Sequence, residues 1–597
     1  MPFPLIFHLI LLLQQPSLNV QQQQDAKASI EGVVVRIGSG EPIAGAELKL
    51  TRVGGAPDAT PGPTPGPTPG PGASASGESI GPPLPPTTAS DGNGRFIFRD
   101  VDAGSYRLSA ARNGYAKLEY GQRDSKGPGT IIPVATGQGI KDIVLRLTPA
   151  GSLNGIVRDV AGEPLTGFQV LLLRSVYTPT GHRYFQRAAS DSTDDRGAYR
   201  FYWVTPGRYY LSAGLGNGPN ENAGLRNPNE VDARPYPMTY YPGTLDPSMA
   251  QAVEILPGQE LNGIEFVLPK LELYRIRGKI IDGTTGKPAH IVQLSMTPRQ
   301  PAGPSNLPPG YNNPVNGTFE FRDVAPGSYW ILAAAEPEMD SPITSSTAPR
   351  TAGEFFEALI SSIPSAQAAV DVSASDVENL VLTLTRGLSI GGLVRMDSQS
   401  QPARADFQNI QIMLEPTGTM QRGNLNLPRP VAPDGTFLLN NVPPGEYRLV
   451  VSCGGCQPSF YVREARLNSV DVLHKPLLIS NTDPGPLEVV LSLNAGQIDG
   501  TVLDDRSQPV PGIQTVLIPE RFRERFEGYK TAVTDSNGHF TIRGIEPGEY
   551  KIFAWEAIEE YAYFDPDFLR AFEQLGKPVS VSESSKQTVD VKVIPAR

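Results

Sequence analysis

The side chains best suited to metal binding or acid–base catalysis are scattered along this 597-residue sequence. Its five histidines are His8, His182, His290, His474 and His539, and none has a glutamate three residues later. A zinc peptidase site combines such a His-x-x-Glu pair with a distant third ligand. We therefore expect no metal and no cofactor.

Two short motifs match reactive sites by composition alone. Gly387-Leu-Ser389-Ile-Gly391 matches a nucleophile elbow, which requires a turn from a strand into a helix. Alternating apolar residues instead place Ser389 at the start of a strand. Cys453 and Cys456 are the only cysteines and follow a predicted strand. We expect them to form a local disulfide, with free thiols or a redox pair as the alternatives.

Acidic residues cluster at predicted turns, as at Asp91, Asp194, Asp195, Asp434 and Asp535. A Ca²⁺ site needs six or more converging oxygen ligands, whereas each of these turns offers one or two carboxylates. Aspartate also stabilises turns by accepting hydrogen bonds from the backbone. We therefore interpret these residues as turn residues, and the sequence indicates a protein that is not an enzyme.

Aromatic residues gather between positions 199 and 241. Five of them are candidates for an exposed platform on which sugar rings stack, because the C–H faces of sugars are apolar: Tyr202, Trp203, Tyr210, Tyr240 and Tyr241. Ordinary packing beneath the long loop 214–242 is the interpretation that we favour.

These residues are embedded in a pattern that recurs five times with identical spacing. Its copies begin at Gly94, Gly197, Gly317, Gly435 and Gly538. In the first copy, Phe96 and Phe98 share one strand face, as do Tyr106 and Leu108 after a turn. In the other four copies the turn is Pro-Gly, which favours a chain reversal. Each copy therefore predicts an aromatic hairpin.

A second alternating segment precedes each hairpin, with glycines at 32, 155, 278, 392 and 500, and a third closes each repeat. Roughly seven strands per repeat are typical of a sandwich. We predict an all-β tandem array of five immunoglobulin- or transthyretin-like sandwiches with one or two short helices in loops. The predicted segments are a signal peptide 1–24, repeats 28–149, 150–270, 271–386, 387–494 and 495–597, and a Pro/Gly-rich insertion 56–86. The first candidate helix is 565–576, and the second is 353–363, which Pro364 would end.

Composition limits the partners and the location. The formal net charge is −11, which offers no field for attracting nucleic acid. Apolar residues 5–13 are too few to span a bilayer and suit a secretory signal peptide. We expect an exported protein in the periplasm, at the cell surface or outside the cell, and not an integral membrane protein.

The repeats resemble the carboxypeptidase regulatory-like domain family. The resemblance lies in the opening Gly-x-Val strand, in a Pro-x-x-Gly step such as Pro42-Ile-Ala-Gly45, and in the Asp-x-x-Gly-x-Phe and Val-x-Pro-Gly-x-Tyr pair. The family fold is similar to transthyretin and to Cna-B adhesin domains, and it implies no peptidase chemistry. Cna-B domains can carry a Lys–Asn isopeptide bond, for which Lys279 and Asn379 would be the candidates in the third repeat. Lys279 alternates with Ile276, Gly278 and Ile280, so we expect it to face away from the core and to form no such crosslink.

The resemblance implies a bacterial exported protein built from many such domains. We therefore expect a structural or adhesive scaffold of the cell envelope that binds an unidentified envelope protein. The alternative is an array of carbohydrate-binding modules that recognises polysaccharide, with the second repeat as its main binding domain.

Overall fold

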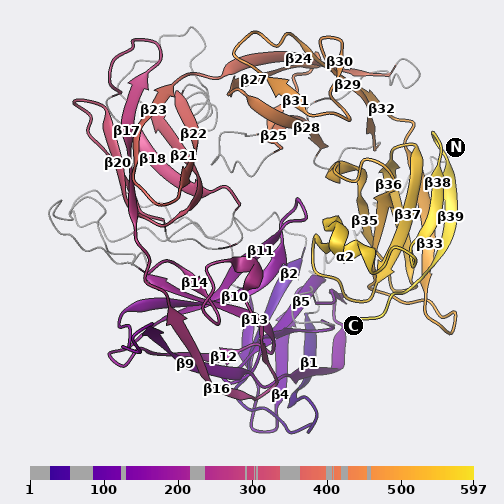
Figure 1. Ribbon diagram of the computed structural model, residues 1–597. Helices are drawn as coiled ribbons and strands as arrows, with labels where there is room; N and C mark the ends of the chain where they lie inside the picture. The colour runs from indigo at the N-terminus through magenta and orange to yellow at the C-terminus, as the bar shows by residue number, and fades with distance from the viewer. Residues whose placement is uncertain are drawn as a thin grey trace, which may run out of the picture. The chain divides into compact units, whose positions relative to one another are not determined.

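A computed structural model gives the fold (Figure 1), and it describes residues 27–53, 85–122, 129–215, 236–289, 292–300, 303, 307–335, 363–397, 407, 409–417, 428–453 and 459–596. The predicted signal peptide and nearly all of the Pro/Gly-rich insertion lie outside these residues. The chain divides into two compact units. One holds the described residues up to Ser152 with Tyr202–Pro206 and Leu256–Glu260, and the other holds the remainder.

The predicted all-β class is confirmed, because strands in sandwiched sheets make up nearly all of the regular structure. The strands of the first repeat are β1 (Ala28–Arg36), β2 (Glu47–Val53), β3 (Thr87–Ala89), β4 (Arg95–Val101), β5 (Gly104–Ala111), β6 (Leu118–Glu119), β7 (Ile132–Val134) and β8 (Gly139–Leu147). Those of the second are β9 (Gly151–Asp159), β10 (Phe168–Tyr177), β11 (Arg183–Ser192), β12 (Ala198–Val204), β13 (Gly207–Leu215), β14 (Thr239–Tyr240), β15 (Val253–Ile255) and β16 (Glu260–Leu268), with a 3-10 turn at Pro247–Met249.

The other three repeats use the same element order with local additions. The third has β17 (Tyr274–Asp282), β18 (Val292–Pro298), β19 (Gly310–Asn312), β20 (Thr318–Val324), β21 (Gly327–Ala335), β22 (Ser365–Val372) and β23 (Val377–Leu384). The fourth has β24 (Leu388–Met396), β25 (Ile410–Pro416), β26 (Arg429–Pro430), β27 (Thr436–Val442), β28 (Gly445–Cys453), β29 (Tyr461–Leu467), β30 (Val470–Asp471), β31 (Leu477–Ile479) and β32 (Leu487–Ser492). The fifth has β33 (Gly496–Leu503), β34 (Gln514–Pro519), β35 (Lys530–Val533), β36 (His539–Ile545), β37 (Gly548–Trp555), β38 (Lys577–Val581) and β39 (Lys586–Lys592), with 3-10 turns at Phe526–Gly528 and Ala562–Phe564 and the helix α2 (Pro566–Arg570).

Each repeat has two sheets, and the opening and closing strands belong to the same one. In the first repeat, one sheet has the order β4-β1-β8, and the other has the order β3-β2-β5-β6 with β7 also on β5. The opening strand β1 pairs antiparallel with β4 and parallel with the closing strand β8. The third, fourth and fifth repeats pair their opening and closing strands in the same parallel way. The opening strand therefore lies between two other strands of its sheet.

The glycine of each opening strand makes the parallel pairing possible. A Cβ atom placed on Gly32 would lie 2.1 Å from the carbonyl oxygen of Ile143 on the closing strand. The same test at Gly155 and Gly278 gives 1.7 Å to the oxygen of Ile264 and 1.9 Å to that of Leu380. Real Cβ atoms do not approach this closely, so the motif selects glycine for space.

The aromatic unit of each repeat connects the two sheets and is not a hydrogen-bonded hairpin. In the first repeat, β4 pairs with β1 whereas β5 pairs with β2 in the other sheet. The prediction of a hairpin is wrong on this point, because a Pro-Gly reversal fixes the local direction of the chain but not the partner of each strand. The connection still places the aromatic residues inside, since Phe96, Phe319 and Phe540 are only 4%, 3% and 4% exposed.

In three of the four Pro-Gly turns the glycine is needed for space rather than for a positive φ. Gly327, Gly445 and Gly548 do not have positive φ, and a Cβ atom there would lie 3.0 to 3.4 Å from the tyrosine two residues later. That tyrosine hydroxyl donates to the carbonyl four residues earlier, as from Tyr550 to Glu546 at 2.7 Å and from Tyr329 to Ala325 at 2.8 Å. A glycine in this turn therefore leaves room for the tyrosine ring that makes this hydrogen bond.

The left-handed residue lies instead just before the valine or isoleucine that ends the first aromatic strand. The five equivalent residues have φ between 51° and 71° and are Asp100, Trp203, Asp323, Asn441 and Gly544. A register shift in the adjacent pairing marks this position as a β-bulge. Asp, Asn and Gly are the residues that tolerate this backbone best, and tryptophan is the exception.

The apolar residues of both sheets meet in a core within each repeat. In the first repeat the buried cluster combines Ile30 and Leu145 of one sheet with Leu48 and Leu108 of the other. Separate clusters of the same kind fill the third, fourth and fifth repeats. Apolar burial, the main favourable term in folding, is therefore supplied repeat by repeat.

The predicted helix near the C-terminus is shorter than expected. It spans Pro566–Arg570, with Asp565 as N-cap accepting a hydrogen bond from the Asp567 N–H at 2.8 Å. Leu569 and Phe572 are buried, but Leu575 is exposed because turns replace the last part of the predicted helix. The second candidate helix, 353–363, lies outside the described residues apart from Ile363.

Glu573, just after this helix, should make the fifth repeat sensitive to acid. Its carboxylate contacts Arg523 Nη2 at 2.9 Å and Lys551 Nζ at 2.7 Å. The Arg523 hydrogen bond is the main reason that the pKa of Glu573 falls to about 2 from 4.5. A lowered pKa stabilises the fold above the unfolded value, and this contribution disappears as pH falls from about 5 toward 2.

We expect Glu573→Gln to cost about 1 kcal/mol at pH 7, a modest value because the three side chains are partly solvated. The variant should also lose part of the decline in unfolding midpoint between about pH 5 and pH 2. Asp590→Asn is the control, since the Asp590 side chain is exposed and forms no ion pair or hydrogen bond with another described residue. Identical acid profiles for Glu573→Gln and the unmodified chain would contradict the assignment.

Candidate functional site

The structure separates the five aromatic residues that were candidates for one platform. Tyr240 is 5% exposed, and its ring packs 5.7 Å from that of Phe185. Tyr210 is half-buried against the same cluster, with its ring 4.6 Å from Phe185. Tyr241 is half-buried edge-on against Phe266, with 5.7 Å between ring centroids. These three tyrosines therefore pack against other aromatic side chains, and they do not form one exposed platform with Tyr202 and Trp203.

Tyr202 and Trp203 are the members that remain on the surface. They are consecutive residues of β12, and their exposed fractions are 62% and 58%. Neighbouring strand residues normally point to opposite faces, but the left-handed backbone of Trp203 interrupts this alternation, and both side chains are exposed. The equivalent pairs in the first, third and fifth repeats are Arg99–Asp100, Arg322–Asp323 and Arg543–Gly544. An exposed aromatic pair thus replaces a polar pair in the second repeat.

The residues considered for catalysis occupy structural positions. Ser389 lies within β24, where its hydroxyl donates to Asn440 Oδ1 at 3.2 Å. Asp91 accepts hydrogen bonds from the backbone N–H groups of Asn93 and Arg95 at 2.9 and 2.8 Å. His539 bonds to Thr501 across β33 and β36, 3.0 Å apart. The described residues contain no group of three or more His, Cys, Asp or Glu that could hold a metal ion.

The predicted disulfide involves a residue that the structure does not describe. Cys453 is the last residue of β28 and is partly exposed. Cys456 lies outside the described residues, so the bridge stays a prediction.

The third repeat carries a surface that sequence reasoning missed. Its short strand β19 pairs with β20 and extends one sheet to the order β19-β20-β17-β23. In the fifth repeat the corresponding strand, β35, pairs in the other sheet with β34. The change of partner places Tyr311 opposite Glu320, on the outer face of the sheet that contains the opening strand.

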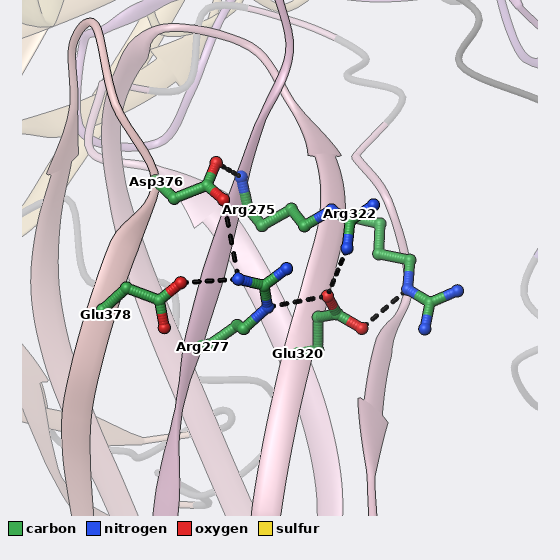
Figure 2. A network of polar contacts seen from close by, with 6 residues as sticks. All are labelled: Arg275, Arg277, Glu320, Arg322, Asp376 and Glu378. Atoms are coloured by element: carbon green, nitrogen blue, oxygen red, sulfur yellow. Dashed lines mark hydrogen bonds and ion pairs between the residues drawn. The ribbon is translucent and has the colours of Figure 1, made fainter. Parts of the chain in front are cut away.

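A network of charged side chains crosses this outer face (Figure 2). Arg277 lies at its centre, with Nε 3.0 Å from Glu320 Oε1 and Nη1 2.5 Å from Glu378 Oε1. Asp376 Oδ2 is 3.6 Å from the same Nη1. Arg322 Nε donates to Glu320 Oε2 at 2.7 Å. Carboxylates on two sides therefore hold one guanidinium in a fixed orientation.

The network keeps its members charged. Burial pushes the pKa of Glu320 upward, but hydrogen bonds from Arg322 and Arg277 outweigh it and hold that pKa below its ordinary value. The hydrogen bond to Glu320, followed by that to Glu378, raises the pKa of Arg277. Both groups are therefore ionised across the physiological pH range.

A depression of about 700 Å³ lies beside the network on the same face. Four strands contribute to its lining, with Tyr311 and Asn312 from β19, Glu320 from β20, Arg277 from β17 and Glu378 from β23. Lys279 and Asn379 also line it and are exposed, which confirms that Lys279 faces away from the core. The period-two pattern that predicted this orientation for Lys279 also applies to Arg275 and Arg277, and it was the available signal for the site.

No helix among the described residues has the length and apolar character needed to cross a membrane.

Comparison with known proteins gives distant likenesses only. No family model matches the chain. Colossin-A of Dictyostelium discoideum is 25% identical over 261 residues, which is 41% of this chain but 2% of that protein. Among solved structures, the GBS52 minor pilin of Streptococcus agalactiae has 14% identity and a TM-score of 0.21, covering 41% of this chain and 97% of its own. The Bacillus anthracis TIE protein has 14% identity and a TM-score of 0.15, covering 60% of this chain and 51% of its own.

Proposed function

We propose that this chain is an exported, non-catalytic scaffold of β-sandwich repeats that binds partners of the bacterial cell envelope through its outer faces. The two-sheet frame recurs with the same glycines, aromatics and tyrosine hydrogen bonds, while the outward residues differ from repeat to repeat. The serine, histidine and aspartate residues described above serve strands and turns. Repeats that share one fold but differ in their outward residues suit a structural or adhesive role, because function depends on the surface residues that a fold carries rather than on the fold itself.

One observation carries the proposal of a binding surface, namely the tryptophan at the left-handed bulge of the second repeat. Trp203 has a φ of 51°, a backbone that costs a bulky residue about 1–2 kcal/mol. Its side chain is also exposed, so apolar burial offsets little of that cost. Strain at an exposed aromatic residue supports a role in binding.

The second candidate function is carbohydrate binding, and the exposed pair Tyr202–Trp203 favours it. Indole and phenol rings offer flat apolar surfaces for the C–H faces of a sugar, with polar edges for its hydroxyls. The binding surface is then this pair alone, because the rings of Tyr210, Tyr240 and Tyr241 pack against Phe185 or Phe266.

Trp203→Asn tests the role of this surface without damaging the fold. Asparagine occupies the same position in the fourth repeat as Asn441, so the variant should unfold at an equal or higher temperature. We expect it to weaken the binding that the unmodified chain shows to purified cell envelopes or to a polysaccharide panel. Binding should persist in Arg99→Ala, a change at the equivalent bulge of the first repeat.

The choice of probe separates the two functions. Retention on envelopes after polysaccharide removal supports the structural or adhesive role, whereas retention on purified polysaccharide supports carbohydrate binding. Unchanged binding by Trp203→Asn to every probe would reject this surface as the binding site.

A further inference from the structure

The depression on the third repeat has features of a built binding surface that is independent of Trp203. All of its lining residues lie between positions 277 and 381. Its volume of about 700 Å³ lies within the range of about 300–1,000 Å³ typical of small-molecule sites. The strand β19 pairs with β20, and its Tyr311 is an aromatic residue of the lining.

The charges of the lining select the class of ligand. The lining contains two cations, Arg277 and Lys279, and two anions, Glu320 and Glu378, so its formal charge is balanced. An anionic ligand would meet the two carboxylates, and a cationic ligand would meet the guanidinium and the ammonium group. A fully apolar ligand would strip water from all four charges without replacing their hydrogen bonds. The balance therefore favours an uncharged polar ligand.

The orientation of Arg277 leaves hydrogen-bonding groups available to such a ligand. Its Nε and Nη1 contact Glu320, Glu378 and Asp376, while Nη2 contacts no other described residue (Figure 2). Likewise only Oε1 of Glu378 contacts Arg277. Donors and acceptors thus stand side by side in positions fixed by ion pairs, and this lowers the entropy cost of binding.

Apolar contact comes from two exposed side chains of the same lining. Tyr311 is 39% exposed, and the guanidinium of Arg322 lies over its ring with 5.9 Å from Cζ to the centroid. That contact restrains the ring. Val381 is 55% exposed on β23. A sugar ring combines apolar C–H faces with hydroxyls that both donate and accept, which matches this mixture.

We propose that the outer face of the β19-β20-β17-β23 sheet is a carbohydrate-binding site for a short stretch of an uncharged polysaccharide. Tyr311 provides the stacking surface, and Arg277, Lys279 and Glu378 bond the ring hydroxyls. The proposal deepens the scaffold function by naming a ligand class and a second binding repeat, and it rests on residues that the Trp203 surface does not share.

Affinity electrophoresis of the full chain tests the site. The probes are uncharged polymers (amylopectin, galactomannan and xyloglucan) with anionic polygalacturonate and cationic chitosan for comparison. We expect at least one uncharged polymer to retard the chain and Tyr311→Ala to weaken that retardation about tenfold, the effect of losing about 1.4 kcal/mol. Lys279→Met is the second variant, because it removes a donor from an exposed site without changing the strand.

The control is Thr383→Ala, an exposed position of β23 outside the depression, which should bind normally. Trp203→Asn should retain the component of binding that Tyr311→Ala removes. If Trp203→Asn loses polymer binding while Tyr311→Ala and Lys279→Met bind fully, this site is rejected. The proposal of a binding surface at Trp203 would then still stand. Preference for polygalacturonate or chitosan, or no retardation by any uncharged polymer, would also overturn the proposal.

Discussion

Gly392→Ala is expected to unfold the fourth repeat, whereas the same change one residue earlier should be harmless. A Cβ atom on Gly392 would lie 2.1 Å from Phe437 Cζ and 2.5 Å from the carbonyl oxygen of Leu487. The ring could rotate, but the carbonyl belongs to the closing strand β32, which pairs in parallel with β24. The clash with this carbonyl can therefore be relieved only by separating β24 from β32. We expect the free energy of unfolding to fall by about 3 kcal/mol or more.

Gly391→Ala is the matched control for this experiment. A Cβ atom there meets nothing within 4 Å, and Gly391 does not have positive φ. Because alanine also reduces the entropy of the unfolded chain, stability should stay equal or rise by up to about 1 kcal/mol. Hydrogen exchange of peptides from β24, β27 and β32 measures both effects. Equal protection in the two variants would refute the steric origin of the opening glycine.

The glycines and aromatics could be predicted from the sequence because their constraints recur at fixed spacing. Each opening glycine pairs across the sheet with the first aromatic of its repeat, as Gly32 with Phe96 and Gly278 with Phe319. The opening-strand motif and the aromatic motif are thus two parts of one structural unit, although they are separated in the sequence. Alternation also predicted correctly which faces are buried, since the period of a strand is two.

Strand partners and the candidate sites were harder to predict because they depend on contacts distant in sequence. The aromatic unit has the local signature of a hairpin, yet β4 and β5 belong to different sheets. The strand β19 has three residues, too few for any periodic signal, and its pairing with β20 brings Tyr311 to the charged face. Among the clustered aromatics of the second repeat, composition could not separate buried Tyr240 from exposed Trp203, because a bulge decides the direction of the side chain.

Phe540→Ala is expected to melt the fifth sandwich while leaving the other repeats folded. Phe540 is 4% exposed and belongs to a core cluster whose buried members all lie between Ile498 and Val591. Its ring lies above Gly500, the residue opposite it across the sheet. Since that glycine has no side chain to fill the space, truncation leaves a cavity, and we expect a loss of about 3–5 kcal/mol.

The location of the lost protection tests whether the repeats are separate folding units. If each core closes on its own, hydrogen exchange should accelerate in β33, β36 and β39 and remain slow in β1, β17 and β24. Val533→Ala, a truncation at a position of the same repeat that is 65% exposed, should leave all of these strands protected. Loss of protection spreading into the other repeats would mean that their cores are coupled, and the chain would then act as one continuous body rather than as a series of interchangeable frames.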